Sequence, residues 1–301
     1  MYKCLLIILY TNRKSHGGIN VKDLIKNEII RYVAEIKNNW FEEINDHYYD
    51  EPIIKFASAD DPLFEEYKTV IGSDHLTPGE AFEIAFGENS YHGGTVISVV
   101  LPINEKIRKS NRNQKKFPSK EWILLHNFQE DIFKESFCKY FEDFLVQMGY
   151  RTVSPYISNW FKAYHTPSGP TSNWSERHIA YAAGLGTFGL NDGFITEKGI
   201  TVRLVSFVTE LKVDPDIRVA KSYTENCLFY SKGTCGACIK RCPANAISEK
   251  GHDRMKCYKC CFGEEAKKVV EAYGGNATVG SGCGLCQSKV PCEYKNPITL
   301  G

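Results

Sequence analysis

Cysteine dominates the chemistry that this sequence offers. Ten of its twelve cysteines lie between residues 227 and 292. They form three groups, which are Cys227, Cys235, Cys238 and Cys242, then Cys257, Cys260 and Cys261, then Cys283, Cys286 and Cys292. Thiolates are soft ligands, and cysteines spaced two or three residues apart are typical of metal centres. The sequence therefore predicts metal binding in its last quarter.

Residues 235–243 indicate the kind of metal centre. They read Cys-Gly-Ala-Cys-Ile-Lys-Arg-Cys-Pro, which reproduces the C-x2-C-x3-C-P ending of the bacterial ferredoxin cysteine run, whose last cysteine binds a second cluster. Because eight or more cysteines fall into two interleaved sets, we expect two [4Fe–4S] clusters. Pro243 and Pro291 stand beside cysteines and would fix the surrounding loops, since the proline ring locks φ.

Two other interpretations of the cysteines are weighed against iron–sulfur clusters. Paired C-x2-C units also build zinc sites with four cysteine ligands, and thiolates suit either metal. A disulfide framework is typical of short secreted chains, whereas this chain has 301 residues. The C-x3-C-P element and the interleaved groups favour iron–sulfur clusters.

Composition sets the general class. The chain is long enough for one large domain and a small one, and its hydrophobic fraction of 43% can supply a substantial core. A net charge of +1 gives no global attraction to nucleic acid or an anionic membrane. No apolar run reaches the roughly 20 residues of a transmembrane helix. Residues 4–10 are apolar but short, and we interpret them as a strand or appendage rather than a signal peptide.

Several stretches must form the framework that positions the cysteines. An apolar stripe at Ile25, Ile29, Ile30, Val33 and Ile36 predicts a helix over residues 21–46. The sequence Thr-Pro-Gly-Glu at 77–80 is typical of a helix start. Residues 95–101 are β-branched and apolar, which predicts a buried strand.

Residues 106–120 carry a run of basic side chains: Lys106, Arg108, Lys109, Arg112, Lys115, Lys116 and Lys120. Their asparagine and serine neighbours favour a solvated loop. A loop that contacts phosphate or nucleic acid is the alternative, because basic runs can form such patches.

The clearest helix is predicted over residues 121–149, where aromatic and aliphatic side chains recur at three- and four-residue steps. Cys138 would lie in it as a buried apolar side chain. A strand is expected at 151–154. Residues 156–174 are rich in aromatic side chains and interrupted by proline and glycine, which predicts a long loop that covers a site or packs on the core.

Ser175 is a plausible N-cap for a helix over residues 176–183, with Glu176 in its first turn. Gly184, Gly186 and Gly189 match G-x-G-x-x-G, but a dinucleotide site needs a preceding strand and a following helix. Here a helix precedes them, so we expect the glycines to allow a tight turn or the close approach of a flat cofactor. A further strand is expected at 200–208.

At this point the sequence resembles the epoxyqueuosine reductase and reductive dehalogenase superfamily. The resemblance is carried by Glu-Arg-His-Ile-Ala-Tyr-Ala-Ala-Gly-Leu-Gly-Thr-Phe-Gly at 176–189, by Arg-Leu-Val-Ser-Phe-Val-Thr-Glu-Leu at 203–211, and by the cysteines that follow. It covers roughly residues 60–297. It implies a nitroreductase-like α/β domain that holds cobalamin and a ferredoxin-like domain that delivers electrons to the cobalt for a reductive cleavage.

The resemblance also implies the cluster ligands. One cluster would use Cys227, Cys235, Cys238 and Cys292, and the other would use Cys242, Cys257, Cys283 and Cys286. Two spacings depart from the family pattern, because Cys227 is displaced from the run and five residues separate Cys286 from Cys292. Cys260 or Cys261 could take the place of Cys257.

The proton donor of the family is not matched. Epoxyqueuosine reductases carry an aspartate shortly before the Glu-Arg element, whereas residues 166–175 contain no carboxylate. A hydroxyl or imidazole would have to serve, and Tyr164, His165, His178 and Tyr181 are the candidates. The helical-repeat tail that helps many epoxyqueuosine reductases hold tRNA is missing, so a tRNA substrate is doubtful, and there is no dehalogenase-type export leader.

We therefore expect an α+β protein with three parts: a strand and helix appendage (1–50), a nitroreductase-like, corrinoid-binding domain (51–212) and a ferredoxin-like domain with two [4Fe–4S] clusters (213–301). The expected function is that of a cytoplasmic iron–sulfur oxidoreductase. It would take electrons from a ferredoxin or flavodoxin and use them to reduce a small molecule. No association with a membrane is expected. The alternatives are a non-catalytic electron carrier or corrinoid-reducing partner, a zinc-stabilised binding module that uses the basic run, and an epoxyqueuosine reductase acting on tRNA.

Overall fold

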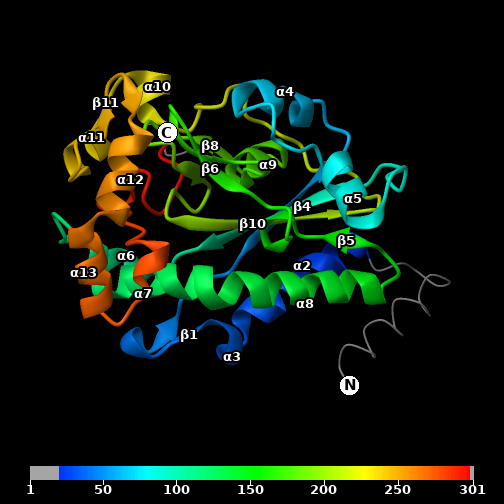
Figure 1. Cartoon of the computed structure of the whole chain (residues 1–301), viewed down its shortest axis with the longest axis horizontal. Coiled ribbons are helices and arrows are strands. Elements are labelled where there is room, and N and C mark those ends of the chain that lie inside the picture. The colour runs from blue at the N-terminus through cyan, green and yellow to red at the C-terminus, as the bar shows by residue number, and fades with distance from the viewer. Residues whose placement is uncertain (1–19, 299–301) are drawn as a thin grey trace.

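The computed structural model describes residues 20–298, and its centre is a four-stranded antiparallel sheet (Figure 1). The strand order is β3 (Ile53–Ser58), β4 (Thr95–Pro102), β10 (Val202–Thr209) and β5 (Thr152–Val153). All eight residues of β4 are buried, as its continuous β-branched run predicts for a central strand. The strands expected at 95–101, 151–154 and 200–208 are confirmed.

Helices cover both faces of this sheet. On one face α2 (Val21–Ala34), α7 (Lys120–Phe128) and α8 (Lys134–Gln147) bury an aromatic-rich core that includes Phe137 and Phe207. On the other face lie α4 (Leu63–Val70), α5 (Pro78–Phe86) and α9 (Glu176–Ala182), which pack on Val96 and Val208. The start of α5 is as expected, since Thr77 and Glu80 form a capping box. The mixed α and β class is confirmed.

The long helix expected over 121–149 is present with one irregularity. A π-helical turn at Gln129–Phe133 (η2) joins α7 to α8. The turn leaves Gln129 buried, where its Oε1 accepts a hydrogen bond of 2.5 Å from the Tyr49 hydroxyl. Cys138 in α8 is fully buried, as predicted. Such π turns often occur at functional sites.

The expectation of one helix over residues 21–46 is wrong beyond Ala34. Glu35 adopts an extended conformation, and the buried Asn39 amide donates to the carbonyls of Val33 and Tyr49 at 2.9 Å each. These bonds turn the chain into four short elements: α3 (Ile36–Asn39), β1 (Trp40–Phe41), η1 (Glu42–Ile44) and β2 (Asp46–His47). The apolar stretch expected at residues 4–10 lies outside the described residues.

The solvated loop expected at 106–120 is also wrong in its first half, which forms α6 (Glu105–Arg112). The side chain of Asn104 caps this helix by accepting the N–H of Lys106 at 2.9 Å, and Ile107 is fully buried beneath it. Six of the seven basic side chains form ion pairs with carboxylates, namely Lys106, Arg108, Lys109, Arg112, Lys116 and Lys120.

The aromatic stretch 156–174 is more regular than the long loop that we expected. After a 3-10 turn (η3, Pro155–Ile157) it forms a hairpin of β6 (Ala163–Thr166) and β7 (Gly169–Ser172). Gly169 has a φ of +115°, which suits the tight turn between the strands. Trp174 follows the hairpin and is buried in the core, with its indole N–H donating to the Ser206 hydroxyl at 2.9 Å.

A second hairpin, β8 (Gly186–Phe188) and β9 (Phe194–Thr196), precedes β10. The last quarter then consists of short elements: α10 (Leu228–Lys232), α11 (Ala237–Arg241), β11 (Ile247–Ser248), β12 (Gly251–His252), α12 (Arg254–Phe262), α13 (Glu264–Ala272), η4 (Ala277–Val279) and η5 (Leu285–Gln287). These helices gather at one end of the sheet (Figure 1). Across residues 20–298, every helix is too short or too polar to cross a bilayer.

Candidate metal centres and the adjoining cavity

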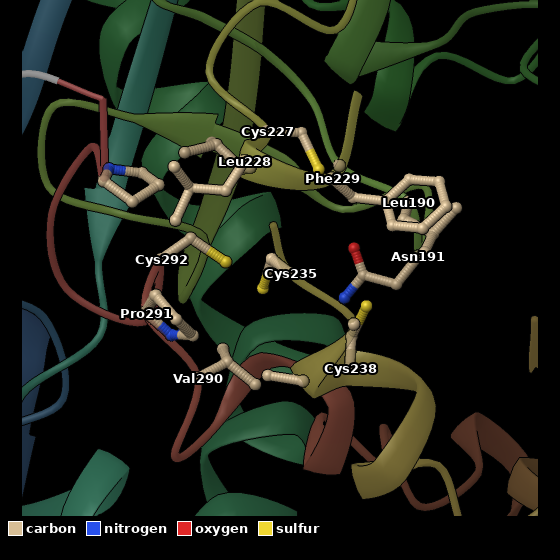
Figure 2. A pocket seen from close by; sticks show the side chains of 15 residues that line it. Leu190, Asn191, Cys227, Leu228, Phe229, Cys235, Cys238, Val290, Pro291 and Cys292 are labelled. Carbon is tan, nitrogen blue, oxygen red and sulfur yellow. The ribbon is translucent and has the colours of Figure 1, made fainter. Parts of the chain in front are cut away.

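The first group of thiols surrounds one cavity, which we call the first thiol cavity. Its wall includes Cys227, Cys235, Cys238 and Cys292, and their sulfur atoms point toward a common space (Figure 2). Apolar side chains such as Leu190 and Val290 complete the wall. The structure thus brings together the four cysteines that sequence reasoning put in one set, although Cys292 is distant from the others in the chain.

A second thiol cavity lies beside the first, with Asn191 in the wall of both. Its lining includes six cysteines: Cys242, Cys257, Cys260, Cys261, Cys283 and Cys286. The neighbouring thiols of Cys257 and Cys283 stabilise the Cys261 thiolate and so lower its pKa. Six thiols therefore share a cavity in which a cubane cluster would need four.

Burial keeps most of these thiols protonated when no cation is present. It raises the pKa of Cys238 to about 11 and that of Cys286 to about 12, because a thiolate is poorly solvated inside the protein. A metal cluster supplies the positive charge that stabilises the thiolates. The eleven cysteines of the described residues are free thiols. Within residues 20–298 no group of three or more His, Cys, Asp or Glu side chains is arranged to hold a single metal ion.

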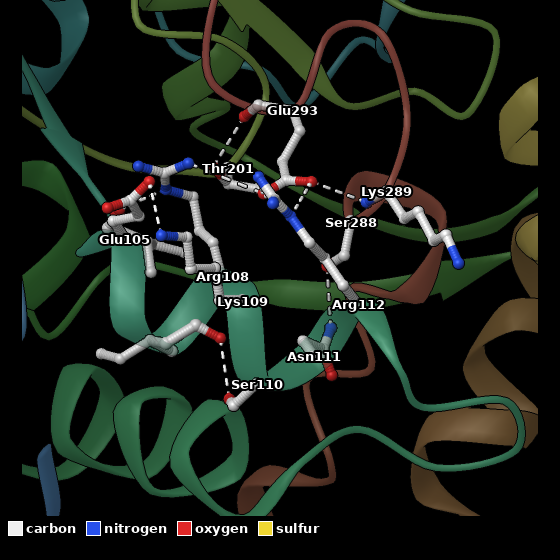
Figure 3. Close-up of polar contacts among 12 residues, drawn as sticks. Glu105, Arg108, Lys109, Ser110, Asn111, Arg112, Thr201, Ser288, Lys289 and Glu293 are labelled. Carbon is white, nitrogen blue, oxygen red and sulfur yellow. Dashed lines mark hydrogen bonds and ion pairs between the residues drawn. The ribbon is translucent and has the colours of Figure 1, made fainter.

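Helix α6 positions Cys292 through the residue that follows it (Figure 3). The Glu293 side chain is only 2% exposed, and the Nε of Arg112 donates to both of its oxygens, at 2.9 and 3.0 Å. The backbone N–H of Lys289 donates to Glu293 Oε2 at 2.7 Å, and Arg108 lies 3.6 Å from Oε1. The basic run therefore fixes the loop that completes the first thiol cavity.

Helix α7 supports the loop that carries Cys283 and Cys286. The indole N–H of Trp122 donates to the carbonyl of Gly282 at 2.8 Å. Gly284 has a φ of +64°, and a Cβ atom there would lie 2.0 Å from Cζ2 of Trp122. Only glycine satisfies both the backbone conformation and the contact.

Arg241 ties the same region to the first cysteine run. It lies between Cys238 and Cys242, and its guanidinium donates to the carbonyls of Leu285 and Ser288 at 3.2 and 3.0 Å. A further bond of 2.8 Å reaches the carbonyl of Gln114. Several bonds from one planar side chain hold three chain segments in register.

A third cavity, the polar cavity, adjoins the second thiol cavity and has a volume of about 370 Å³. The two share Arg177, Gly193 and Gln287 in their walls. Its volume lies within the usual range of small-molecule sites. Charged side chains from four elements line it: Glu130, Lys134, Glu176, Arg177 and Arg203.

Glu176 has an unusual position in the polar cavity. Both of its carboxylate oxygens are buried, and neither has a hydrogen-bond partner of good geometry. Burial raises the pKa of Glu176 to about 7, although Ser206 and Lys134 nearby favour the charged form. The carboxyl group therefore holds a proton in a substantial part of the molecules at neutral pH.

Sequence reasoning considered Glu176 only as a first-turn acid and overlooked the polar cavity. Glu130 and Lys134 stand four residues apart on the expected helix, so their ion pair of 2.8 Å was foreseeable. Nothing in the sequence showed that this pair would face Glu176 and Arg203, because four different elements bring them together.

The four expected proton donors do not line the polar cavity. Tyr164 lines a separate groove with His75 and Lys162. His165 contacts the Tyr258 ring on α12.

The other two candidates lie on α9. His178 is half-buried, with its Nδ1 2.8 Å from the Ser175 hydroxyl, and desolvation lowers its pKa to about 3. This contact replaces the N-cap bond expected of Ser175. Tyr181 stacks on Tyr223, with ring centroids 4.3 Å apart.

The three glycines of the 184–189 stretch pack on protein. Gly184 has a φ of +72°, as a tight turn after α9 requires. A Cβ atom at Gly184 would lie 2.9 Å from the Cα of Arg218, and one at Gly186 would lie 2.3 Å from the carbonyl oxygen of Ile195. Gly189 lines the first thiol cavity. The close approach expected at Gly184 and Gly186 is thus made by backbone.

Known proteins similar to this chain can now be compared with these sites. An epoxyqueuosine reductase from Cellulophaga algicola is 31% identical over 114 residues, which are 37% of this chain and 35% of that protein. The chain resembles the epoxyqueuosine reductases. The match spans about a third of this curated relative's length, and no protein-family model matches the chain.

Solved structures of two enzyme classes superpose on this chain. A reductive dehalogenase, described in connection with B12-dependent dehalogenation, superposes with a TM-score of 0.51 at 15% identity, covering 82% of this chain and 30% of that one. The fold is therefore similar to that of a reductive dehalogenase. An epoxyqueuosine reductase solved with a tRNA-Tyr stem loop gives a TM-score of 0.48 at 20% identity, covering 92% of this chain and 70% of the other. The resemblance inferred from the sequence is confirmed.

Proposed function

We propose that this chain is an iron–sulfur oxidoreductase in which two [4Fe–4S] clusters deliver electrons to a reactant in the polar cavity. The observation that carries the proposal is the continuity of the three cavities. Asn191 is common to the two thiol cavities, and Arg177, Gly193 and Gln287 are common to the second thiol cavity and the polar cavity. The order of the cavities suggests the order of electron transfer.

The chemistry of the thiol cavities fits iron–sulfur clusters. We assign Cys227, Cys235, Cys238 and Cys292 to one cluster, and Cys242, Cys257, Cys283 and Cys286 to the other. Cys260 and Cys261 line the second cavity too and remain alternatives to Cys257. Each cluster carries one electron at a time, so a ferredoxin or flavodoxin suits the role of donor.

We further propose a division into the appendage 1–50, the nitroreductase-like domain 51–212 and the ferredoxin-like domain 213–301. A small core of Leu190, Ile195, Ile200, Cys227, Ile247 and Val290 supports close packing between the last two. Limited proteolysis that releases a stable iron-binding fragment beginning near residue 213 would support this division, whereas cleavage that always removes the iron would contradict it.

The similarity to epoxyqueuosine reductases and reductive dehalogenases leads us to propose a corrinoid as the cofactor. The polar cavity suits its reacting part, because it adjoins the second thiol cavity and contains a buried carboxyl group without a partner. A whole corrinoid would extend beyond the 370 Å³ of this cavity. When bound, a reduced corrinoid supplies the nucleophilic or reducing metal centre.

Glu176 is the residue that we propose as the proton source, in place of the four hydroxyl and imidazole candidates. A reductive cleavage R–X + 2e⁻ + H⁺ → R–H + X⁻ breaks one bond to the leaving group and forms one bond to hydrogen. The electrons come from the external donor through the clusters. The proton leaves the Glu176 carboxyl group and is replaced from solvent. A pKa of about 7 suits both steps at neutral pH.

The test begins with anaerobic reconstitution and measurement of iron and sulfide. Hydroxocobalamin is then added, the protein is desalted, and EPR spectra are recorded before and after dithionite. We expect reduced [4Fe–4S] signals together with near-stoichiometric cob(II)alamin. Clusters without retained corrinoid would refute the corrinoid as cofactor. The protein would then be an electron carrier or would use a different cofactor. A colourless protein that contains zinc would refute it.

A tRNA substrate is the second candidate, favoured by the similarity to proteins named epoxyqueuosine reductase. The basic run 106–120 offers little support, because six of its seven cations already pair with carboxylates. A gel-shift titration with a queuosine-type tRNA stem loop separates the two candidates. Micromolar binding that survives 200 mM salt would favour the tRNA, whereas salt-labile or undetectable binding would favour a small molecule.

A further inference from the structure

We propose that the polar cavity is a binding site for a small organic carboxylate, held by Arg177 and Arg203, with Glu176 as the switch that sets the charge of the site. The inference deepens the proposed function, on which it rests only in treating this cavity as the place where the substrate binds. It names the chemical class of that substrate. Binding itself is measurable without turnover.

The two arginines are the cations of the cavity that remain available. Neither forms an ion pair with a carboxylate among residues 20–298, and each makes a hydrogen bond to a backbone carbonyl, that of Asp192 for Arg177 and that of Val202 for Arg203. A guanidinium group has five N–H donors in a planar fork. Such a fork matches the two oxygens of a carboxylate.

The other permanent charges in the wall compensate each other. Lys134 Nζ lies 2.8 Å from Glu130 Oε2, and the Tyr156 hydroxyl donates to the same oxygen at 3.0 Å. The ammonium group also lies 3.2 Å above the Tyr156 ring. Glu130 is therefore neutralised by its own neighbours, and it does not offset the charge of the two arginines.

Glu176 decides the remaining charge. The charged and titratable groups around it are Lys134 and Cys138 on α8, Glu130 on η2, Tyr156, Arg203 on β10 and Arg177 on its own helix. Because its pKa is about 7, Glu176 is mostly neutral at pH 6 and mostly ionised at pH 8. Asp192 already offsets part of the charge of Arg177. Ionisation of Glu176 makes the net charge of the cavity one unit less positive above neutrality than below it.

The wall also has an apolar side, formed by Phe161, Phe194, Ile200 and Leu204. An inorganic anion would leave this surface without a partner. A carboxylate on an apolar or aromatic body would cover it while its oxygens face the arginines. Because the wall combines two arginines with an apolar surface, we propose an organic carboxylate rather than an inorganic anion.

The probe is benzoate, with benzamide as its uncharged counterpart of the same shape. Each is titrated calorimetrically into anaerobically reconstituted protein whose iron and sulfide have been measured. We expect benzoate to bind at least tenfold more tightly than benzamide at pH 6. If only the form with neutral Glu176 binds, benzoate affinity falls by about tenfold between pH 6 and pH 8, although benzoate stays ionised throughout.

Variants separate the parts of the proposal. Arg203→Gln should weaken benzoate binding at least tenfold, while the control Arg151→Gln, an exposed arginine paired with Glu210, should not change it. Glu176→Gln should bind benzoate with the same affinity at pH 6 and pH 8. Circular dichroism spectra show whether each variant is folded.

Equal affinities for benzoate and benzamide, or unchanged binding by Arg203→Gln, would overturn the carboxylate site. A pH dependence that persists in Glu176→Gln would overturn the role of Glu176. Full clusters without benzoate binding would sink this inference and leave the redox function standing. Benzoate binding by a protein that takes up no iron would support this inference and refute the redox function.

Discussion

The contact between helix α6 and the Cys292 loop leads to a quantitative prediction for Glu293→Gln. The glutamine keeps the shape of the side chain but turns one acceptor oxygen into an NH2 group. Glu293 Oε2 accepts from Arg112 at 3.0 Å and from the Lys289 N–H at 2.7 Å, and an NH2 group there can accept neither bond.

The expected cost follows from the exposure of the partners. Hydrogen bonds to a charged group contribute about 1.5–3 kcal/mol each. The Arg112 side chain is 31% exposed, so water compensates part of its loss, whereas the carboxylate itself is 2% exposed. The substitution should therefore cost about 2–4 kcal/mol. At this chain length that corresponds to a fall of about 4–8 °C in the apparent Tm.

The assay is anaerobic thermal unfolding of the reconstituted protein at one fixed scan rate, together with the rate of iron loss to a chelator. The matched control is Glu105→Gln, whose ion pair with Lys109 is more than half exposed on both sides and should contribute less than about 1 kcal/mol. Iron should leave Glu293→Gln faster than the control, because the loop carries Cys292. Equal Tm values and equal iron loss in the two variants would refute the reasoning.

Three further predictions concern the thiols, Glu176 and a glycine. Cys292→Ser should reduce the iron content from about eight to about four atoms per chain, whereas Cys138→Ser should leave it unchanged; iron analysis and EPR decide. The raised pKa of Glu176 means that the native state loses stability as pH rises from 4.5 to about 7, by about 3 kcal/mol. Denaturant titrations should show this loss in the wild type and not in Glu176→Gln. Gly284→Ala should abolish the second cluster signal in EPR, because its Cβ would overlap an indole ring, while Gly233→Ala, at a similar φ of +63° but with open space around it, should keep both signals.

Local patterns in the sequence were sufficient for much of the framework. The capping box at Thr77 and the apolar run of β4 are short-range signals that tertiary packing left intact. The long helix was predictable from its apolar period, but the π turn within it was not. Its buried Gln129 bonds to Tyr49, eighty residues away in the sequence.

The candidate site, too, has features that local sequence patterns predicted and features that depend on distant contacts. Cysteine spacing and family resemblance were enough to group the thiols that line the first cavity. The partner of Arg112 lies 181 residues away, so the basic run could not be recognised as a support for Cys292. The polar cavity was unpredictable for a similar reason, since α9, β10 and the π turn each contribute one or two charged side chains.

The crossing of the two cysteine sets has a consequence for biosynthesis. Cys242 leaves the first run to join the second cavity, and Cys292 returns to the first after the second is lined. As the chain emerges from the ribosome, the first cavity stays open on one side until the last cysteine has been synthesised. Cluster assembly machinery would therefore meet a complete second set of thiols, which ends at Cys286, before Cys292 completes the first set.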